Sequence, residues 1–141
     1  MPNLTPPIVS ALTAGVLVIL QMILLLLVVL SRRTNRQSLG TGNSPALERA
    51  IRRHGNFAEN AAIFIAGFAL FEILGGSRIL LEILCAAFVL GRLSHAFGLS
   101  LTKTVNVFRF VGIVTTVVVG FTLGQGLIKL ALPLAMPLLP H

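Results

Sequence analysis

Four long apolar stretches, separated by short polar segments, dominate the pattern of hydrophobic and polar positions along this chain. They predict helices over about residues 8–31, 46–74, 78–97 and 104–130. The first stretch carries Gln21 as its only strongly polar side chain, and about 20 apolar residues are enough to span a bilayer. Its positive charges follow the stretch instead of preceding it, which favours a membrane anchor over a cleaved signal peptide.

The second stretch has a polar first half and an apolar second half. The apolar half, residues 61–71, rises only about 17 Å as a helix, which is short of the roughly 30 Å hydrocarbon core. A helix that spans must therefore include residues 56–60, so that Glu59 lies near or inside the membrane boundary.

Composition supports the bilayer as the solvent of this protein. Hydrophobic residues make up 55% of the 141 residues and charged residues only 11%, and mean hydropathy is +0.95. A soluble domain of this size needs about a quarter charged residues, and a disordered chain needs low hydrophobicity. We therefore expect an all-α integral membrane protein in which residues 1–141 form a single four-transmembrane-helix bundle. The single Cys85 excludes an intrachain disulfide.

The net charge of +7 reflects membrane topology and not nucleic-acid binding, because the basic residues lie between the apolar stretches. The first loop region holds Arg32, Arg33, Arg36, Arg49, Arg52 and Arg53, and the third holds Arg92, Lys103 and Arg109. Elsewhere only Arg78 and Lys129 are basic. The positive-inside rule predicts that the first and third loops face the cytoplasm and that both termini lie outside.

One face of the second helix carries the candidate chemistry. At about 100° per residue, Arg49, Arg52, Asn56 and Glu59 fall within roughly 80° of arc. A carboxylate at membrane depth costs about 2.5–3.5 kcal/mol unless it is paired or hydrated. We therefore expect Glu59 to pair with an arginine at the same end of the bundle: Arg52, Arg92 or Arg109. Such a cluster is either a binding site or an ion network that only holds the helices together.

Smaller features complete the pattern. Small residues recur every fourth position in the last helix (Gly112, Thr116, Gly120 and Gly124), which lets helices pack closely. Gly98 is expected to end the third helix, and Pro133, Pro137 and Pro140 to end the fourth. Pairing of Glu48 with Arg52 fits a simple surface contact. Because His54 and His95 are not at metal-ligand spacing, no metal site is expected.

Two segments together resemble a known family. Residues 48–60 have the spacing Glu-Arg-x-x-Arg-x-x-x-Asn-x-x-Glu at the start of the second of four helices. Residues 91–98, Gly-Arg-Leu-Ser-His-Ala-Phe-Gly, follow at the end of the third, and Arg109 lies early in the fourth. The chain resembles bacterial-type members of the membrane-associated proteins in eicosanoid and glutathione metabolism (MAPEG).

The resemblance implies a homotrimer with active sites between subunits near the cytoplasmic face. It also implies glutathione as cosubstrate and a lipophilic electrophile or hydroperoxide as second substrate. The glutathione-binding residues would be Arg32, Arg49, Arg52, Asn56, Glu59 and His95. Arg109 would be catalytic and would stabilise the thiolate. Relatives often carry tyrosine where this chain has Asn60 and Leu99.

Three functions remain open from the sequence. The first is a glutathione-dependent transferase or peroxidase, whose lipophilic substrate would enter laterally between the first and fourth helices. The second is a non-catalytic, lipid-binding membrane protein of the same family. The third, a small four-helix exporter, ranks last because such exporters need a carboxylate within the first helix, and residues 8–30 have none.

Overall fold

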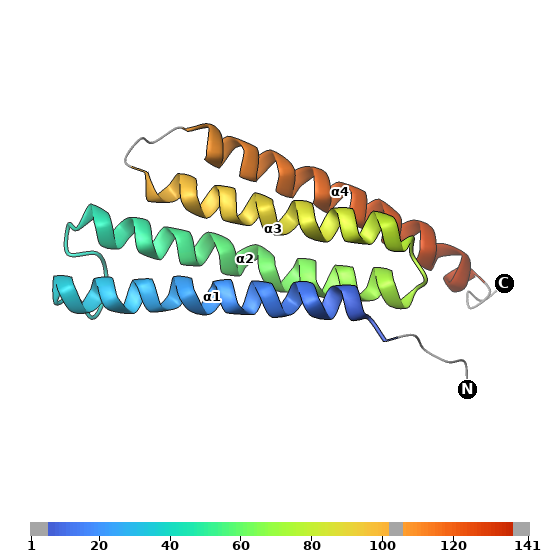
Figure 1. Ribbon diagram of the computed structural model, residues 1–141, viewed down its shortest axis with the longest axis horizontal. Coiled ribbons are helices and arrows are strands. Elements are labelled where there is room, and N and C mark those ends of the chain that lie inside the picture. The colour runs from blue at the N-terminus through green and yellow to red at the C-terminus, as the bar shows by residue number, and fades with distance from the viewer. Residues whose placement is uncertain (1–5, 102–105, 137–141) are drawn as a thin grey trace.

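Four helices lie along one another in the computed structural model, which describes residues 6–101 and 106–136 (Figure 1). They are α1 (Ile8–Asn35), α2 (Pro45–Ile73), α3 (Arg78–Ser100) and α4 (Val107–Ala135). Each is long and apolar enough to cross a membrane. The expected all-α, multi-pass membrane protein is therefore confirmed.

The helix starts follow local capping chemistry. The Ser44 side chain accepts a hydrogen bond from the backbone N–H of Leu47, and proline follows at the first helical position of α2. Ser77 accepts from the N–H of Leu80 in the same way at the start of α3. A side-chain oxygen at these positions satisfies an N–H group that has no partner within the helix.

The helix ends differ from those expected. α1 extends to Asn35 and ends with Arg36 in a left-handed conformation, at φ 52°. α3 does not end at Gly98, which is buried within it, and continues to Ser100. α4 passes through Pro133, so the prediction that this proline ends the helix was wrong.

The helix continues through Pro133 because this proline lies near the end of α4. The chain closes one more turn beyond it, where the N–H of Met136 donates to the carbonyl of Leu132. The expected start of this helix at 104, with Lys103, lies outside the described residues, as do Pro137 and Pro140.

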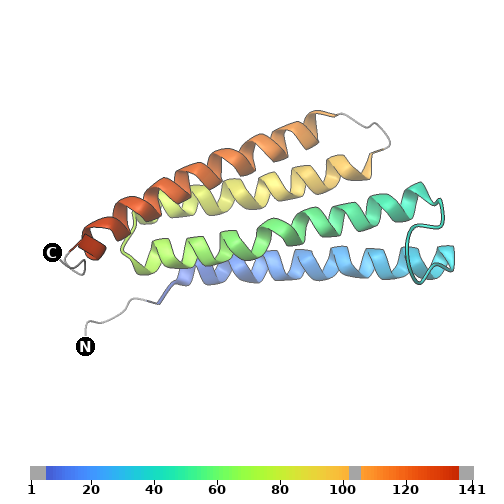
Figure 2. The same cartoon turned by 180° about the vertical axis from the view of Figure 1, so that it is seen from behind.

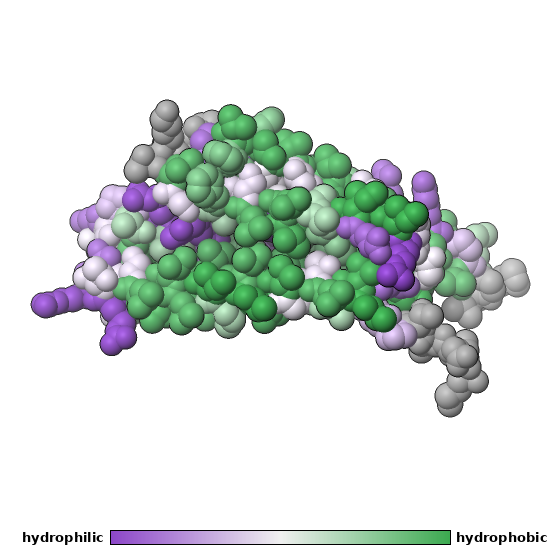
Figure 3. All heavy atoms as spheres, viewed as in Figure 1, coloured by the Kyte–Doolittle hydropathy of each residue, from purple (hydrophilic) through white to green (hydrophobic). Residues whose placement is uncertain are grey.

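A cluster of phenylalanines forms the centre of the bundle. The rings of Phe64 and Phe88 stack with centroids 4.1 Å apart, and Phe68 meets Phe88 edge-on at 5.8 Å. Phe68 and Phe88 are fully buried. The outer surface shown in Figure 3 is largely hydrophobic, with hydrophilic residues gathered toward the two ends. This distribution suits a bundle surrounded by lipid.

The arrangement of the helices gathers two loop regions at one end. The end of α1, the start of α2, the end of α3 and the start of α4 lie together, and α2 and α4 run in the same direction (Figures 1 and 2). Within the chain, α1 packs on α2 and α3, whereas α4 packs on α3 and α2. Helices α1 and α4 do not touch.

The closest crossing of helices is between α3 and α4. A Cβ added to Gly112 would lie 2.6 Å from the carbonyl oxygen of Gly91 and 2.8 Å from the backbone nitrogen of His95. Close packing at Gly112 is thus confirmed. Gly124, at the other end of the same strip of small residues, has nothing within 4 Å.

Candidate functional site

The predicted polar face of α2 lies on a continuous helix. Arg52 and Glu59 are exposed, while Arg49 and Asn56 are half-buried. The helix runs without interruption from Pro45 to Ile73. Glu59 therefore lies 14 residues, or about 21 Å, from the far end of α2, which is well within the roughly 30 Å hydrocarbon thickness.

Arg92 fixes the height of this polar face relative to α4. One terminal nitrogen of its guanidinium donates to the carbonyl oxygen of Asn56 at 3.2 Å, and the other donates to that of Gly112 at 3.5 Å. Since α2 and α4 run in the same direction, Asn56 and Gly112 lie at similar depth. Arg109 is three residues before Gly112, or about 4.5 Å closer to the loop end. Its backbone is therefore level with the segment of α2 between Arg52 and Asn56.

Glu59 has no ion pair or hydrogen bond within the part of the chain that the structure describes. The expected ion pair with Arg52, Arg92 or Arg109 is therefore not found among the described residues of the single chain. Arg92 is engaged by backbone carbonyls, and Arg52 faces Glu48 at 3.8 Å, both side chains being exposed. The Glu48–Arg52 surface contact is thus confirmed, and the Glu59 carboxylate faces outward from the subunit.

His95 is buried between α3 and α4, with 6% of its surface exposed. Its Nδ1 lies 3.4 Å from the carbonyl oxygen of Arg109. Arg109 is half-buried in the first turn of α4, where the Asn106 side chain accepts from its backbone N–H at 3.0 Å. The structure thus brings His95 to the backbone of Arg109, and not to the polar face of α2.

Arg32 is directed toward the loop that follows it. Its guanidinium donates to the carbonyl oxygens of Gln37, Ser38 and Gly40 at 3.1–3.4 Å. These bonds order the connection between α1 and α2. Arg32 and Arg109 are carried by α1 and α4, which do not touch within the chain.

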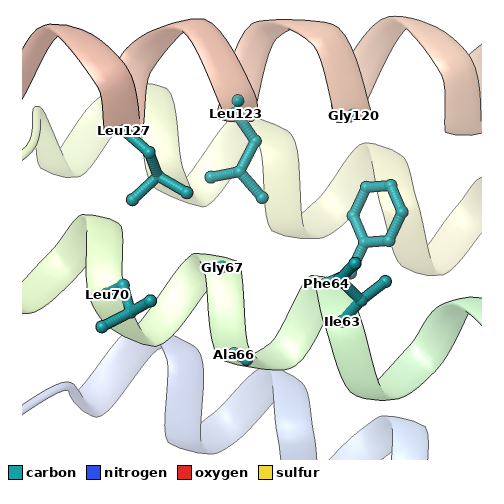
Figure 4. Close-up of a pocket in the computed structure, with 9 residues that line it drawn as sticks. Ile63, Phe64, Ala66, Gly67, Leu70, Gly120, Leu123 and Leu127 are labelled. Carbon is teal, nitrogen blue, oxygen red and sulfur yellow. The ribbon is translucent and has the colours of Figure 1, made fainter.

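An apolar groove continues the polar face of α2 toward the opposite end of the bundle. It lies between α2 and α4, has a volume of about 380 Å³, and opens to the surface. Figure 4 shows the Phe64 ring rising from α2 toward Gly120, with Leu123 and Leu127 pointing down from α4. Ile63, one turn after Glu59, begins its α2 wall. A charged patch and an apolar groove therefore adjoin on one face.

Comparison with known proteins identifies the family. The family model described as "MAPEG family" matches residues 10–128, which is most of the chain and includes every candidate site residue. The chain belongs to the MAPEG family. No curated protein and no solved structure matches.

MAPEG proteins include glutathione-dependent transferases and peroxidases, and the family typically uses glutathione. In this MAPEG chain, the described residues contain no group of three histidine, cysteine or acidic side chains placed to hold a metal ion. The polar side chains at the loop end of the described chain include arginines, amides, histidines and the two exposed carboxylates of Glu48 and Glu59.

Two polar contacts of this MAPEG chain were not found from its sequence. Glu72, in the last turn of α2, accepts hydrogen bonds from the backbone of Val9 and Ser10 in α1. The Gln21 side-chain amide lies 2.7 Å from Nε2 of His54. Gln21 was visible in the sequence as the one strongly polar side chain of its helix, which was a signal that it needs a partner.

Proposed function

We propose that this MAPEG protein is a membrane-bound, glutathione-dependent transferase or peroxidase. It binds glutathione at the loop end of the bundle and directs the thiolate at a lipophilic electrophile or hydroperoxide dissolved in the membrane. The observation that carries the proposal is the exposed polar face of α2, which continues directly into the apolar groove between α2 and α4. Polar glutathione requires the charged face, and the lipophilic second substrate requires the adjoining apolar groove.

The charges of the polar face suit glutathione, a tripeptide with two carboxylates and one ammonium group. Arg49 and Arg52 offer guanidinium groups that match carboxylates in geometry. Glu59, unpaired within the described chain, offers a partner for the ammonium. Because such a carboxylate is costly at membrane depth, binding of an ammonium group there offsets part of that cost.

Arg109 supplies the positive charge for the thiolate. A cysteine-type thiol has a pKa of about 8.5 and is mostly protonated at neutral pH. Lowering that pKa by two units requires about 2.7 kcal/mol, and a guanidinium about 4 Å away supplies on the order of 4 kcal/mol at an effective dielectric of 20. With an aromatic halide, the thiol proton leaves to water, the sulfur–carbon bond forms, and halide departs with the carbon–halogen electron pair.

A homotrimer with sites between subunits is part of the proposal. Arg32 and Arg109 lie on helices that do not touch within one subunit. A single glutathione that contacts both would have to lie where α1 of one subunit meets α4 of another. Lateral entry of the second substrate between α1 and α4 likewise requires two subunits. By the positive-inside rule, the arginine-rich loops support a cytoplasmic position for these sites.

Thiolate formation by the purified protein tests the proposal. In neutral detergent with glutathione, the wild-type protein is expected to produce thiolate absorbance and to react with an aromatic halide. Arg109→Ala should abolish both, because no other group is proposed to stabilise the sulfur charge. Arg33→Ala, which removes an exposed arginine at the same end, and Arg78→Ala, at the opposite end, should change neither. Equal loss in Arg109→Ala and either control would place the site elsewhere.

The second candidate is a lipid-binding MAPEG protein without catalysis. It is favoured by the residues at the two positions where relatives often carry tyrosine. Asn60 donates to the carbonyl oxygen of Asn56 in its own helix, and Leu99 has no polar group to offer. Absence of glutathione binding at millimolar concentration, together with retention of lipid in the groove between α2 and α4, would favour this function over the first.

A further inference from the structure

A second groove lies on a different face of the bundle, between α1 and α3, and holds two arginines. It has a volume of about 240 Å³, and its charged lining residues are Arg53 and Arg92. Arg53 lies about 100° around α2 from Arg52 and about 120° from Glu59. The groove is therefore separate from the proposed glutathione site.

No acidic side chain of the protein neutralises these two charges. The chain has four acidic residues, and all of them are engaged elsewhere or point elsewhere. Glu48 pairs with Arg52, Glu82 pairs with Arg78, Glu72 binds the start of α1, and Glu59 is exposed on the other face of α2. Arginine in or near the hydrocarbon region is costly without a counter-charge.

Burial of the two guanidinium groups raises the free-energy cost of leaving their charges without a counter-charge. Arg92 is 4% exposed, and its terminal nitrogens bond only to backbone carbonyls. The Nε atoms of both Arg53 and Arg92 are buried without an acceptor among the described residues. Both guanidinium groups thus keep their full positive charge at the edge of one apolar groove.

The groove lies at the loop end of the bundle, where the ends of the membrane-spanning helices are expected to reach the edge of the membrane. Arg53 donates through a terminal nitrogen to the hydroxyl of Ser100 at 2.8 Å, and Ser100 is the last residue of α3. From there the groove descends along Phe97 and Leu93 of α3 and Leu24 of α1. Phe97 and Leu93 are also exposed on the outer surface, so the groove opens toward lipid.

We propose that this groove binds one anionic phospholipid, with its phosphate at Arg53 and Ser100 and the start of an acyl chain along the apolar walls. Arg53 donates a hydrogen bond to the phosphate, and Arg92 contributes positive potential from below. The Ser100 hydroxyl, which donates to the carbonyl oxygen of Ala96 at 3.0 Å in the structure, turns its one proton to the phosphate when the lipid binds. A volume of about 240 Å³ is too small for a whole phospholipid with two acyl chains. The cavity therefore holds only one part of the lipid, and the rest lies on the exposed side chains around it.

A binding titration of the purified full-length protein tests this site. The protein in neutral detergent is titrated with a phosphatidylglycerol that carries a fluorescent tail, and anisotropy is followed. Arg53→Gln should weaken binding by roughly tenfold, as expected for the loss of one charge-assisted hydrogen bond. The matched control Arg33→Gln removes an exposed arginine at the same end and should leave the affinity within about twofold.

A second variant tests the apolar part without changing any charge. Ala96, which lines the groove, is replaced by leucine, and this should also weaken binding. Unlabelled phosphatidylglycerol should compete, whereas phosphatidylcholine should compete more weakly and inorganic phosphate at millimolar concentration should not. Both Arg53→Gln and Ala96→Leu should keep glutathione thiolate formation, which separates this proposal from the proposed function.

Several results would overturn the lipid site. Equal losses in Arg53→Gln and Arg33→Gln would reduce it to general surface attraction. Full competition by inorganic phosphate would show a site for a soluble anion. Dissociation of an oligomer by Arg53→Gln, in size-exclusion chromatography with light scattering, would assign the missing counter-charge to a neighbouring subunit.

Discussion

Glu72, a residue of α2, caps the N-terminus of α1. The residue before α1 is Pro7, which provides no side-chain cap. The two carboxylate oxygens of Glu72 instead accept from the backbone N–H of Val9 at 3.0 Å and from the backbone and hydroxyl of Ser10 at 2.8 and 2.6 Å. A negative charge at this position also interacts favourably with the positive end of the helix dipole. The start of α1 is thereby bound to the last turn of α2.

Replacement of Glu72 by glutamine is expected to destabilise the bundle by about 1 kcal/mol, since loss of an N-terminal helix cap typically costs 0.5–2 kcal/mol. Glutamine keeps the size of the side chain but has one oxygen to accept where the carboxylate has two. Unfolding of the purified protein in mixed micelles, titrated with a denaturing detergent, measures the difference. Glu82→Gln is the matched control, because Glu82 forms an exposed pair with Arg78 and such pairs contribute little. Similar midpoints for the two variants would refute the capping role.

Arginine side chains at the loop end stabilise this structure mainly through backbone carbonyls. Arg32 binds three carbonyls of one loop, and Arg92 joins the backbones of α2 and α4. An arginine has five donors in a planar arrangement, so one side chain connects several carbonyls. Counting charges in the sequence does not reveal this use, because carbonyl oxygens are present at every residue.

At the scale of elements, the crossing of α3 and α4 positions the start of α4. Gly112 and Gly91 bring the two backbones together, and one turn before Gly112 lies Arg109. Any change that separates these helices would therefore move the arginine proposed to stabilise the thiolate.

We expect Gly112→Ala to lower both stability and thiolate formation. The added methyl group would lie 2.6 Å from the carbonyl oxygen of Gly91, and backbone atoms cannot move aside as a side-chain end can. Overpacking typically lowers the free energy of unfolding by about 1–3 kcal/mol. Gly124→Ala, in the same helix but with nothing within 4 Å, should be neutral or slightly stabilising. The same detergent titration and thiolate absorbance measure both variants, and equal behaviour would show that the crossing tolerates a side chain.

Local signals in the sequence predicted the positions of the four helices and the residues that share one side of α2. Hydropathy located the four helices, and the spacing of Arg52, Asn56 and Glu59 placed them on one side of α2. Each of these features depends on residues within a few turns of one another, where helical geometry is fixed.

Contacts between distant residues could not be predicted in the same way. The capping of α1 joins positions 62 and 63 residues apart, and the bond of Arg92 to Asn56 joins positions 36 apart. The absence of a partner for Glu59 is also a property of the packed bundle. Gly98 signals a helix end in isolation, but here it is buried against the start of α4, where its lack of a side chain is needed.

At the scale of the whole molecule, the two grooves proposed as binding sites lie on different faces of the bundle. One lies between α2 and α4 and the other between α1 and α3. Because α1 and α4 lie on opposite sides of the pair α2 and α3, each groove is bounded by only one of them. This arrangement leaves each subunit with one face for the proposed glutathione site and another for the proposed phospholipid.

The orientation of the bundle sets which compartment would supply the proposed glutathione, and the charge of the loops predicts that orientation. The arginine-rich loop between α1 and α2 is expected in the cytoplasm, and the turn between α2 and α3 outside. Single cysteines test this in a Cys85→Ser background, since Cys85 is the only native cysteine. Leu39 is 84% exposed in the first loop, and the Arg78 side chain is 81% exposed at the start of α3. In intact cells, a membrane-impermeant maleimide should label Arg78→Cys and not Leu39→Cys, while a permeant one should label both. The reverse pattern would place the polar face of α2 outside the cell and remove cytoplasmic glutathione as its substrate.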